Sequence, residues 1–165
     1  MPPVVCIVGR SGAGKTMLLE KLIPELKRRG YRVAAVKHTG HDPDLDTEGK
    51  DSWRYARAGA DCTVLSSARK IAVFRIADHD WAPDEIARFL GDEFDIVLAE
   101  GFKRSKAPKI EVHRGANEEL VSSPEEVLAI VSDEPAACGF PRYSPADVRA
   151  LADLIEQRVM GRSKA

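Results

Sequence analysis

Residues 9–16 read GRSGAGKT and directly follow the apolar run VVCIV of residues 4–8. The run is typical of a buried strand, and the sequence KTMLLEKLIPELKRRG that starts at residue 15 has a helical stripe of leucines. The stretch matches G-x-x-x-x-G-K-[ST], in which glycines let backbone amides approach phosphate oxygens. The following helix N-terminus adds free N–H donors and partial positive charge. The sequence therefore predicts a phosphate-binding loop, or P-loop, between the first strand and the first helix.

Two side chains complete this predicted loop. Lys15 supplies a compact positive charge for the β and γ phosphates of a nucleotide, and the hydroxyl of Thr16 is a ligand for Mg²⁺. Arg10 suggests a further hypothesis, in which it reaches the nucleotide of a second subunit and assists hydrolysis. The predicted nucleotide-binding residues of this stretch are Gly9, Arg10, Ser11, Gly12, Ala13, Gly14, Lys15, Thr16 and Met17.

A second carboxylate on the metal side is predicted at the end of another strand. Residues 94–101 read FDIVLAEG, an apolar run that ends in Glu100. Ligands of α/β sheets bind at the carboxyl ends of the strands, which is where this acid falls. Aspartate is the usual residue here, and the longer Glu100 can reach Mg²⁺ through a water molecule. Gly101 would let the backbone come close to a γ-phosphate.

Residues 38–54, HTGHDPDLDTEGKDSWR, form a polar loop with three alternating aspartates, Asp42, Asp44 and Asp46. They resemble the start of a calcium loop, but Thr47 stands where a glycine is required and Trp53 where a bidentate glutamate is required. These two departures exclude an EF-hand.

The same loop offers residues for other ligands. His38 and His41 are three residues apart, but no third ligand follows at a spacing typical of zinc sites. We interpret the loop as switch-like, with Asp46 positioning Mg²⁺ or a water molecule and Lys50 acting as a second cation near phosphate. The predicted catalytic residues are thus Lys15, Asp46 and Glu100, and the predicted metal-binding residues are Thr16, Asp46 and Glu100.

Composition bounds the class of protein. The chain has 165 residues, of which 44% are hydrophobic and 31% charged, so we expect one globular domain over 1–165. The net charge of −1 does not favour generic nucleic-acid binding, and no apolar run is long enough to span a membrane. The three cysteines are far apart and form no C-x-x-C pair, which indicates a reduced, cytoplasmic chain with buried thiols.

The order of elements predicts the fold. Strands are expected at 4–8, 31–37, 94–99, 109–113 and 127–131, and a hairpin of two strands within 62–77. Helices are expected after the P-loop with a bend at Pro24, at 51–58, from 83 to about 90, and from an N-cap at Ser144 with Pro145 at N1. Alternating strands and helices predict an α/β fold of the P-loop NTPase type. It would be a three-layer sandwich whose mostly parallel sheet has helices on both faces and an added antiparallel hairpin.

Four stretches taken together resemble a known family. GRSGAGKT, VKHTGHD, GKDSWRYARAGA and VLAEGFKRSKAPKIEVHR occur in this order between about residue 4 and residue 133. The combination is similar to MobB, the family of molybdopterin-guanine dinucleotide biosynthesis adapters. The resemblance implies GTP binding with Mg²⁺, weak GTP hydrolysis and a homodimer. It also implies an accessory role beside the MobA nucleotidyltransferase, which attaches GMP to molybdopterin, and molybdopterin-containing proteins as further partners.

The resemblance assigns residues by position. Gly12, Gly14, Lys15 and Thr16 would hold the phosphates, and Glu100 with Gly101 would take the Walker B place. The guanine signature N-K-x-D is absent, and the nearest acid for the guanine edge is Asp133, after the last strand. A preference for GTP over ATP is thus implied by the family and not by the residues.

Five cations surround the EGFK segment, and two other functions stay open. This group is either a solvated loop or a docking surface for a pterin phosphate or an acidic partner, and its members are Lys103, Arg104, Lys106, Lys109 and Arg114.

A small-molecule kinase would share the P-loop but needs a lid, for which residues 67–90 are short. A protein-binding module with a structural nucleotide is the other alternative.

Overall fold

The computed structural model of the chain describes residues 1–41, 46–115, 118–134 and 139–161. The chain divides into two compact units, one made of Met1–His38 with Ala82–Ala165 and the other of Thr39–Trp81. Each unit is described by itself below. That the whole chain acts as one domain stays a prediction.

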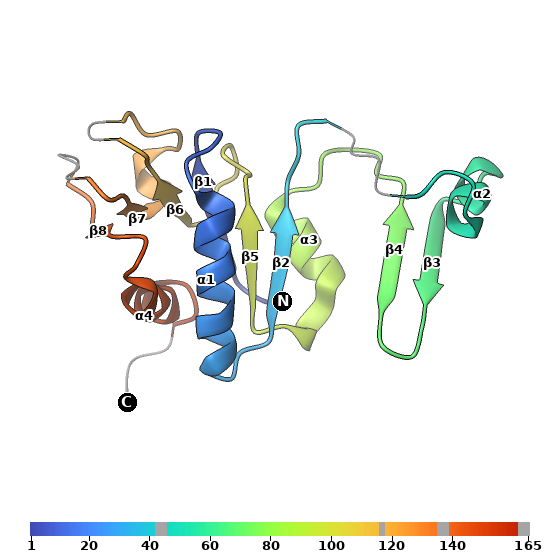
Figure 1. The fold of residues 1–165 in the computed structure, drawn as a ribbon, viewed down its shortest axis with the longest axis horizontal. Helices are drawn as coiled ribbons and strands as arrows, with labels where there is room; N and C mark the ends of the chain where they lie inside the picture. Colours follow the sequence, from blue (N-terminus) through green and yellow to red (C-terminus); the bar gives the residue numbers. More distant parts are fainter. Residues whose placement is uncertain (42–45, 116–117, 135–138, 162–165) are drawn as a thin grey trace. The chain divides into compact units, whose positions relative to one another are not determined.

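The first unit is built on a parallel sheet of six strands in the order β2-β5-β1-β6-β7-β8 (Figure 1). The strands are β1 (Val4–Gly9), β2 (Val33–Lys37), β5 (Ile96–Glu100), β6 (Lys109–Val112), β7 (Val127–Val131) and β8 (Arg142–Tyr143). The helices of this unit are α1 (Lys15–Arg28), α3 (Pro83–Leu90) and α4 (Val148–Arg158), with short 3₁₀ turns at Gly91–Glu93 and Pro124–Glu126. The predicted α/β class with its parallel sheet is confirmed.

The side chains of β1 point alternately into two cores, because helices cover both faces of the sheet. Val5 and Ile7 point into a large core that also holds Leu22 of α1 and Leu151 of α4. Cys6, between them, belongs to a second core on the opposite face. Ile86 and Ala87 of α3 pack into the cores on that opposite face. Because successive side chains of a strand point to opposite faces, a fully buried strand such as β1 is apolar at every position.

Helix α1 runs through Pro24, and the predicted stop signal at Gly30 is confirmed. Gly30 has φ 91°, and its amide donates to the carbonyl of Lys27 at 3.0 Å. The amide of Tyr31 donates to the carbonyl of Leu26 at 3.1 Å, which completes a Schellman motif. This turn leads the chain back into the sheet at β2. The bend expected at Pro24 stays a prediction.

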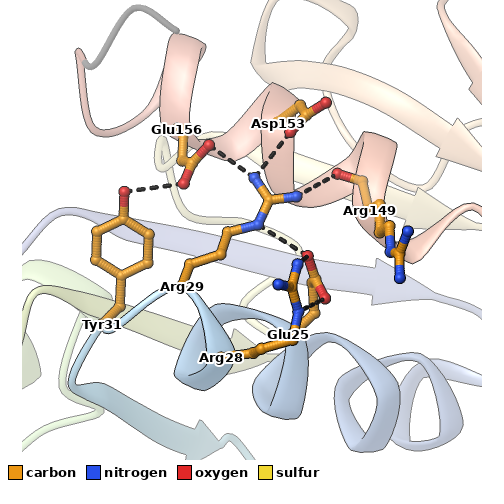
Figure 2. A network of polar contacts seen from close by, with 7 residues as sticks. All are labelled: Glu25, Arg28, Arg29, Tyr31, Arg149, Asp153 and Glu156. Atoms are coloured by element: carbon orange, nitrogen blue, oxygen red, sulfur yellow. Dashed lines mark hydrogen bonds and ion pairs between the residues drawn. The ribbon is translucent and has the colours of Figure 1, made fainter. Parts of the chain in front are cut away.

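A network of charges joins the end of α1 to α4 (Figure 2). The guanidinium of Arg29 donates to Glu25 at 2.9 Å, to Asp153 at 2.8 Å and to Glu156 at 2.7 Å. Burial opposes the charged form of Arg29, but hydrogen bonds to Asp153 and Glu25 outweigh it and raise the pKa of Arg29 above its usual range. Tyr31 donates to the second oxygen of Glu156 at 2.9 Å. The network therefore fixes the C-terminal half of α1 against α4.

The second unit contains α2 (Asp51–Arg57) and the antiparallel pair β3 (Cys62–Ser66) and β4 (Ile71–Arg75). The predicted hairpin is confirmed, and its turn is closed by bonds between Ser67 and Lys70. Thr63 is 5% exposed, on the strand that packs against α2. Val64 and Val73 lie opposite each other on the other face and are 55% and 43% exposed. One face of the hairpin is therefore apolar and open.

Two expectations from the sequence are wrong. The last helix begins at Val148 with Asp147 as its N-cap, and not at Ser144, because residues 142–143 extend the sheet as β8. The side chain of Asp147 turns back to accept from the amide of Ser144 at 2.8 Å, which makes this segment a turn. Cys62 is exposed and so is not a buried thiol, whereas Cys6 is buried and Cys138 lies outside the described residues. None of the described helices is long and apolar enough to cross a membrane.

Candidate functional site

The predicted P-loop lies at the carboxyl edge of the sheet, between the central strand β1 and helix α1. Gly9 has φ 147°, and a Cβ atom there would stand 2.3 Å from the carbonyl oxygen of Val112 on the neighbouring β6. A side chain at this position would push the two strands apart, so the glycine is required. Gly14 caps α1 with φ 102°. Among the described residues, no acceptor pairs with the amides of Gly14, Lys15 or Thr16, which are the free donors of a helix N-terminus.

The remaining loop residues differ in their exposure. Arg10 and Ser11 are exposed, and Ala13 is 8% exposed and belongs to the core. Met17, one turn into the helix, is 63% exposed. Buried Ala13 anchors the loop to the sheet, so the exposed residues on either side of it stand above the edge.

The ammonium group of Lys15 folds back over the loop. It donates to the carbonyl of Arg10 at 2.8 Å and to that of Gly9 at 3.3 Å. Removal from water lowers the pKa of Lys15, Glu100 opposes this, and the nearby Lys103 and Lys37 lower the pKa further. Lys15 is thus a cation held over the loop by two backbone carbonyls, a position that suits an incoming anion.

Thr16 and Glu100 meet across two elements, as the sequence predicted for a metal site. The hydroxyl of Thr16 on α1 donates to Oε2 of Glu100 on β5 at 2.9 Å. The other oxygen, Oε1, lies 3.5 Å from the ammonium of Lys37 on β2. A hydroxyl and a carboxylate beside a phosphate-binding loop are oxygen ligands of the kind that Mg²⁺ takes, so these residues fit the ion.

The backbone after Glu100 turns sharply, which the sequence predicted only in part. Gly101 has φ 103°, and a Cβ atom there would stand 3.1 Å from Cβ of His38. Phe102 is the one described non-glycine residue with positive φ, at 59°. Its ring packs on the ring of His38, with centroids 4.5 Å apart. Strained backbone of this kind is common at ligand sites, and no local sequence signal marks it.

A cavity of about 370 Å³ extends from the P-loop along the sheet edge. The loop and α1 contribute Gly12 and Met17 to its lining, and Asp133 also lines it. Asp133, which the sequence predicts beside the guanine edge, lines this cavity together with Ser144–Ala146. The pattern of Ser144–Ala146 predicts the start of a helix and gives no sign of a site, but these residues form the turn after β8. The volume lies within the usual range for small-molecule sites.

The predicted group of five cations is divided in the structure. Lys109 is fully buried, donates to Glu126 at 2.6 Å and to the carbonyl of Ser105, and so does not belong to a docking surface. Lys103, Arg104 and Lys106 are exposed on the loop that this buried lysine holds. Arg114 lines the cavity, and its Nη1 is 3.8 Å from where a Cβ of Gly12 would be.

Asp46 and Lys50 belong to the second unit. The carboxylate of Asp46 accepts from the hydroxyl of Ser52 at 2.9 Å and from the amide of Thr47 at 2.8 Å. Lys50 is exposed at the N-cap of α2. Their roles at the phosphate site stay predictions, and Asp42 and Asp44 lie outside the described residues. In the described part of the chain, no group of three or more His, Cys, Asp or Glu residues could hold a metal ion.

Comparison with known proteins agrees with the resemblance seen in the sequence. The sequence model of the family described as MobB, molybdopterin guanine dinucleotide synthesis protein B, matches residues 4–133. The chain is 38% identical to the molybdopterin-guanine dinucleotide biosynthesis adapter protein of Haemophilus influenzae, over 93% of this chain and 88% of that protein. It is also 38% identical to the adapter protein of the same name from Escherichia coli, over 94% of this chain and 92% of that protein.

Solved structures give the same result for the fold. The crystal structure of Bacillus subtilis MobB superposes with a TM-score of 0.77 at 30% identity, over 97% of this chain and 99% of that one. A crystal structure of a molybdopterin-guanine biosynthesis protein B superposes with a TM-score of 0.70 at 30% identity, over 93% of this chain and 97% of that one. The match therefore includes the P-loop, the strand that ends in Glu100 and nearly all other elements, and the chain belongs to the MobB family of molybdopterin-guanine dinucleotide biosynthesis adapter proteins.

Proposed function

We propose that this chain binds GTP with Mg²⁺ at the P-loop, hydrolyses it slowly and assists a MobA-type nucleotidyltransferase in the synthesis of molybdopterin guanine dinucleotide. The observation that carries the proposal is the arrangement at the head of α1. There Lys15 is held over the loop, and the pair of Thr16 and Glu100 stands beside it. The names of the relatives support the pathway.

In this proposal each residue of the loop has a separate task. The free amides at the head of α1 and the ammonium of Lys15 bind the phosphates, and Lys15 exchanges its two carbonyl partners for phosphate oxygens. Thr16 would hold Mg²⁺ directly and Glu100 through water. The ion itself would neutralise charge on the phosphates. Slow hydrolysis is what the resemblance to the family implies, and no arginine is assigned to the phosphates as a finger, which would be worth roughly 10³–10⁵ in rate.

The cavity beside the loop would take the ribose and the base. Its walls are Gly12 and Met17 on one side and Ser144–Ala146 on the other, with Asp133 exposed at its rim. A carboxylate there can accept hydrogen bonds from the N1–H and N2–H groups of guanine, which adenine lacks. A preference for GTP over ATP follows from the family together with Asp133.

Partners are proposed on two surfaces. The exposed cations Lys103, Arg104 and Lys106 would face the phosphate of molybdopterin or an acidic patch of the nucleotidyltransferase. The open apolar face of the β3–β4 hairpin would pair with a second copy of the chain, which gives the expected homodimer.

A thermal-shift panel tests the proposal most directly. GTP, GDP, ATP and ADP are added with Mg²⁺ or with a chelator, and the apparent melting temperature is measured. We expect the largest rise with GTP and Mg²⁺, because a ligand that binds only the native state stabilises it by mass action. Equal stabilisation by ATP would contradict the assignment of Asp133, and no stabilisation by any nucleotide would contradict nucleotide binding.

Phosphate release separates the alternatives. Slow release of phosphate from GTP without an added acceptor is expected for the accessory GTPase. Transfer that requires a small acceptor would instead identify a kinase, and intact nucleotide after prolonged incubation would identify a binding module.

A further inference from the structure

Lys37 is a cation at the site that the P-loop pattern does not include. It is the last residue of β2 and lies directly opposite Glu100 of β5 in the register of the parallel sheet. Glu100 is in turn opposite Ile7 of β1, whose side chain packs in the core beneath α1. Residues in register share a face of the sheet, so Lys37 and Glu100 both project on the side where α1 begins.

The carboxylate of Glu100 is therefore held between two partners. Oε2 accepts from the hydroxyl of Thr16 at 2.9 Å, and Oε1 is 3.5 Å from the ammonium of Lys37. The two side chains of this ion pair differ in exposure: that of Glu100 is 13% exposed and that of Lys37 is 64% exposed. The carboxylate is fixed, whereas the long lysine side chain can leave it at little cost.

We propose that Lys37 is a positioning residue that neutralises Glu100 when no metal is bound, and that it thereby sets how strongly nucleotide binding depends on Mg²⁺. This inference rests on the proposed function. Without Mg²⁺, the negative charge of Glu100 faces the phosphates as a like charge, and Lys37 cancels it. If Thr16 and Glu100 held Mg²⁺, the positive charge of the ion would offset that of the carboxylate, and Lys37 would no longer be needed for this.

The test compares two dissociation constants for GDP, one in Mg²⁺ and one in excess chelator, measured by calorimetry. We expect Lys37→Met to raise the ratio of the dissociation constant in chelator to that in Mg²⁺ about five- to tenfold. This is the size of effect expected when one charge is lost near a protein surface. The dissociation constant in Mg²⁺ should change less than about twofold, because the ion then supplies the charge.

Three variants make the result specific. Lys37→Arg keeps the charge and should keep the wild-type ratio. Lys27→Met removes an exposed lysine from the other end of α1, roughly 18 Å along the helix axis, and should also keep the ratio. Glu100→Gln removes the charge that Lys37 would cancel. The double variant Lys37→Met with Glu100→Gln should therefore bind GDP in chelator as well as Glu100→Gln alone does.

Two outcomes overturn the inference while nucleotide binding stands. If Lys37→Met weakens GDP equally in Mg²⁺ and in chelator, Lys37 is a simple phosphate ligand. If it changes neither value, the ion pair with Glu100 has no bearing on the site. If the wild-type chain binds GDP in neither condition, the proposed function itself fails, and the inference fails with it.

Discussion

At the scale of single residues, the contacts of Lys15 support its proposed role in binding an anion. Its ammonium is bonded to two carbonyls of its own loop, and removal from water lowers its pKa, so its charged form is less stabilised than in solution. A phosphate group would supply the missing negative charge. In the proposed function the lysine would therefore contribute to binding, and it does not belong to the core.

Lys15→Ala should weaken the binding of Mg²⁺–GTP by about tenfold to a hundredfold, because hydrogen bonds to charged groups are worth about 1.5–3 kcal/mol. The melting temperature without nucleotide should stay close to that of the wild type. Calorimetric titration measures the affinity, and Lys27→Ala serves as a control that removes one exposed lysine from the same helix. Equal affinity in the wild type and Lys15→Ala would contradict the placement of phosphates in the loop.

The sequence predicted the residues of the site whose position depends on local geometry. Lys15 and Thr16 follow from the loop pattern, and Glu100 from a strand that ends in an acid. The sequence does not place Lys37 at the site, because Lys37 reaches Glu100 through the register of β2 with β5. Strand order is a long-range property, so a single sequence without structure does not place it.

At the scale of elements, the network at the end of α1 determines how α1 and α4 pack (Figure 2). Helix α1 begins at the P-loop, and the turn that precedes α4 lines the cavity. Arg29 bonds to Glu25 of α1 and to Asp153 of α4, so the network joins the C-terminal end of α1 to α4. Helix α4 shows the limit of local signals: its start was predicted at Ser144, but residues 142–143 join the sheet first.

The stability that Glu25 contributes to the packing of α1 against α4 is expected to depend on pH. Hydrogen bonds from Arg28 and then Arg29 lower the pKa of Glu25 from 4.5 to about 2. Because the folded-state pKa is depressed, the stabilisation is complete above pH 4.5 and is lost as the pH falls towards 2. Glu25→Gln should therefore lower the melting temperature at pH 7, and the difference from the wild type should shrink between pH 4.5 and 2. Thermal unfolding followed by circular dichroism measures this difference.

Glu20→Gln is the matched control for this prediction. Glu20 lies on the same helix and is exposed, and among the described residues no arginine pairs with it. Its replacement should leave the melting temperature almost unchanged at every pH. A difference between Glu25→Gln and the wild type that is independent of pH would show that the carboxylate charge is not what stabilises the contact.

At the scale of the whole molecule, the β3–β4 hairpin is the element on which the proposed homodimer depends. Val64 and Val73 are paired across the strands, and Ile71 at the end of the same face is 71% exposed. An isolated two-stranded ribbon is marginally stable in water, and its open edges and apolar face favour pairing with another sheet. A second copy presents the same complementary surface, so a two-fold dimer satisfies both ribbons at once.

A pair of variants tests which face of the hairpin would form the proposed dimer. Val64→Lys places a charge on the open apolar face and should convert the dimer to a monomer, because the charge would be buried without a partner at the interface. Leu65→Lys places the same charge on the opposite face of the same strand, where Thr63 is buried, and should leave the dimer intact.

Light scattering after size exclusion gives the mass of each species at several concentrations. A wild-type chain that is monomeric throughout would contradict the dimer, and a dimer that Leu65→Lys disrupts but Val64→Lys does not would move the interface to the other face. Because the two residues are neighbours in one strand, such a reversal would follow from side-chain direction alone and not from a general loss of the hairpin.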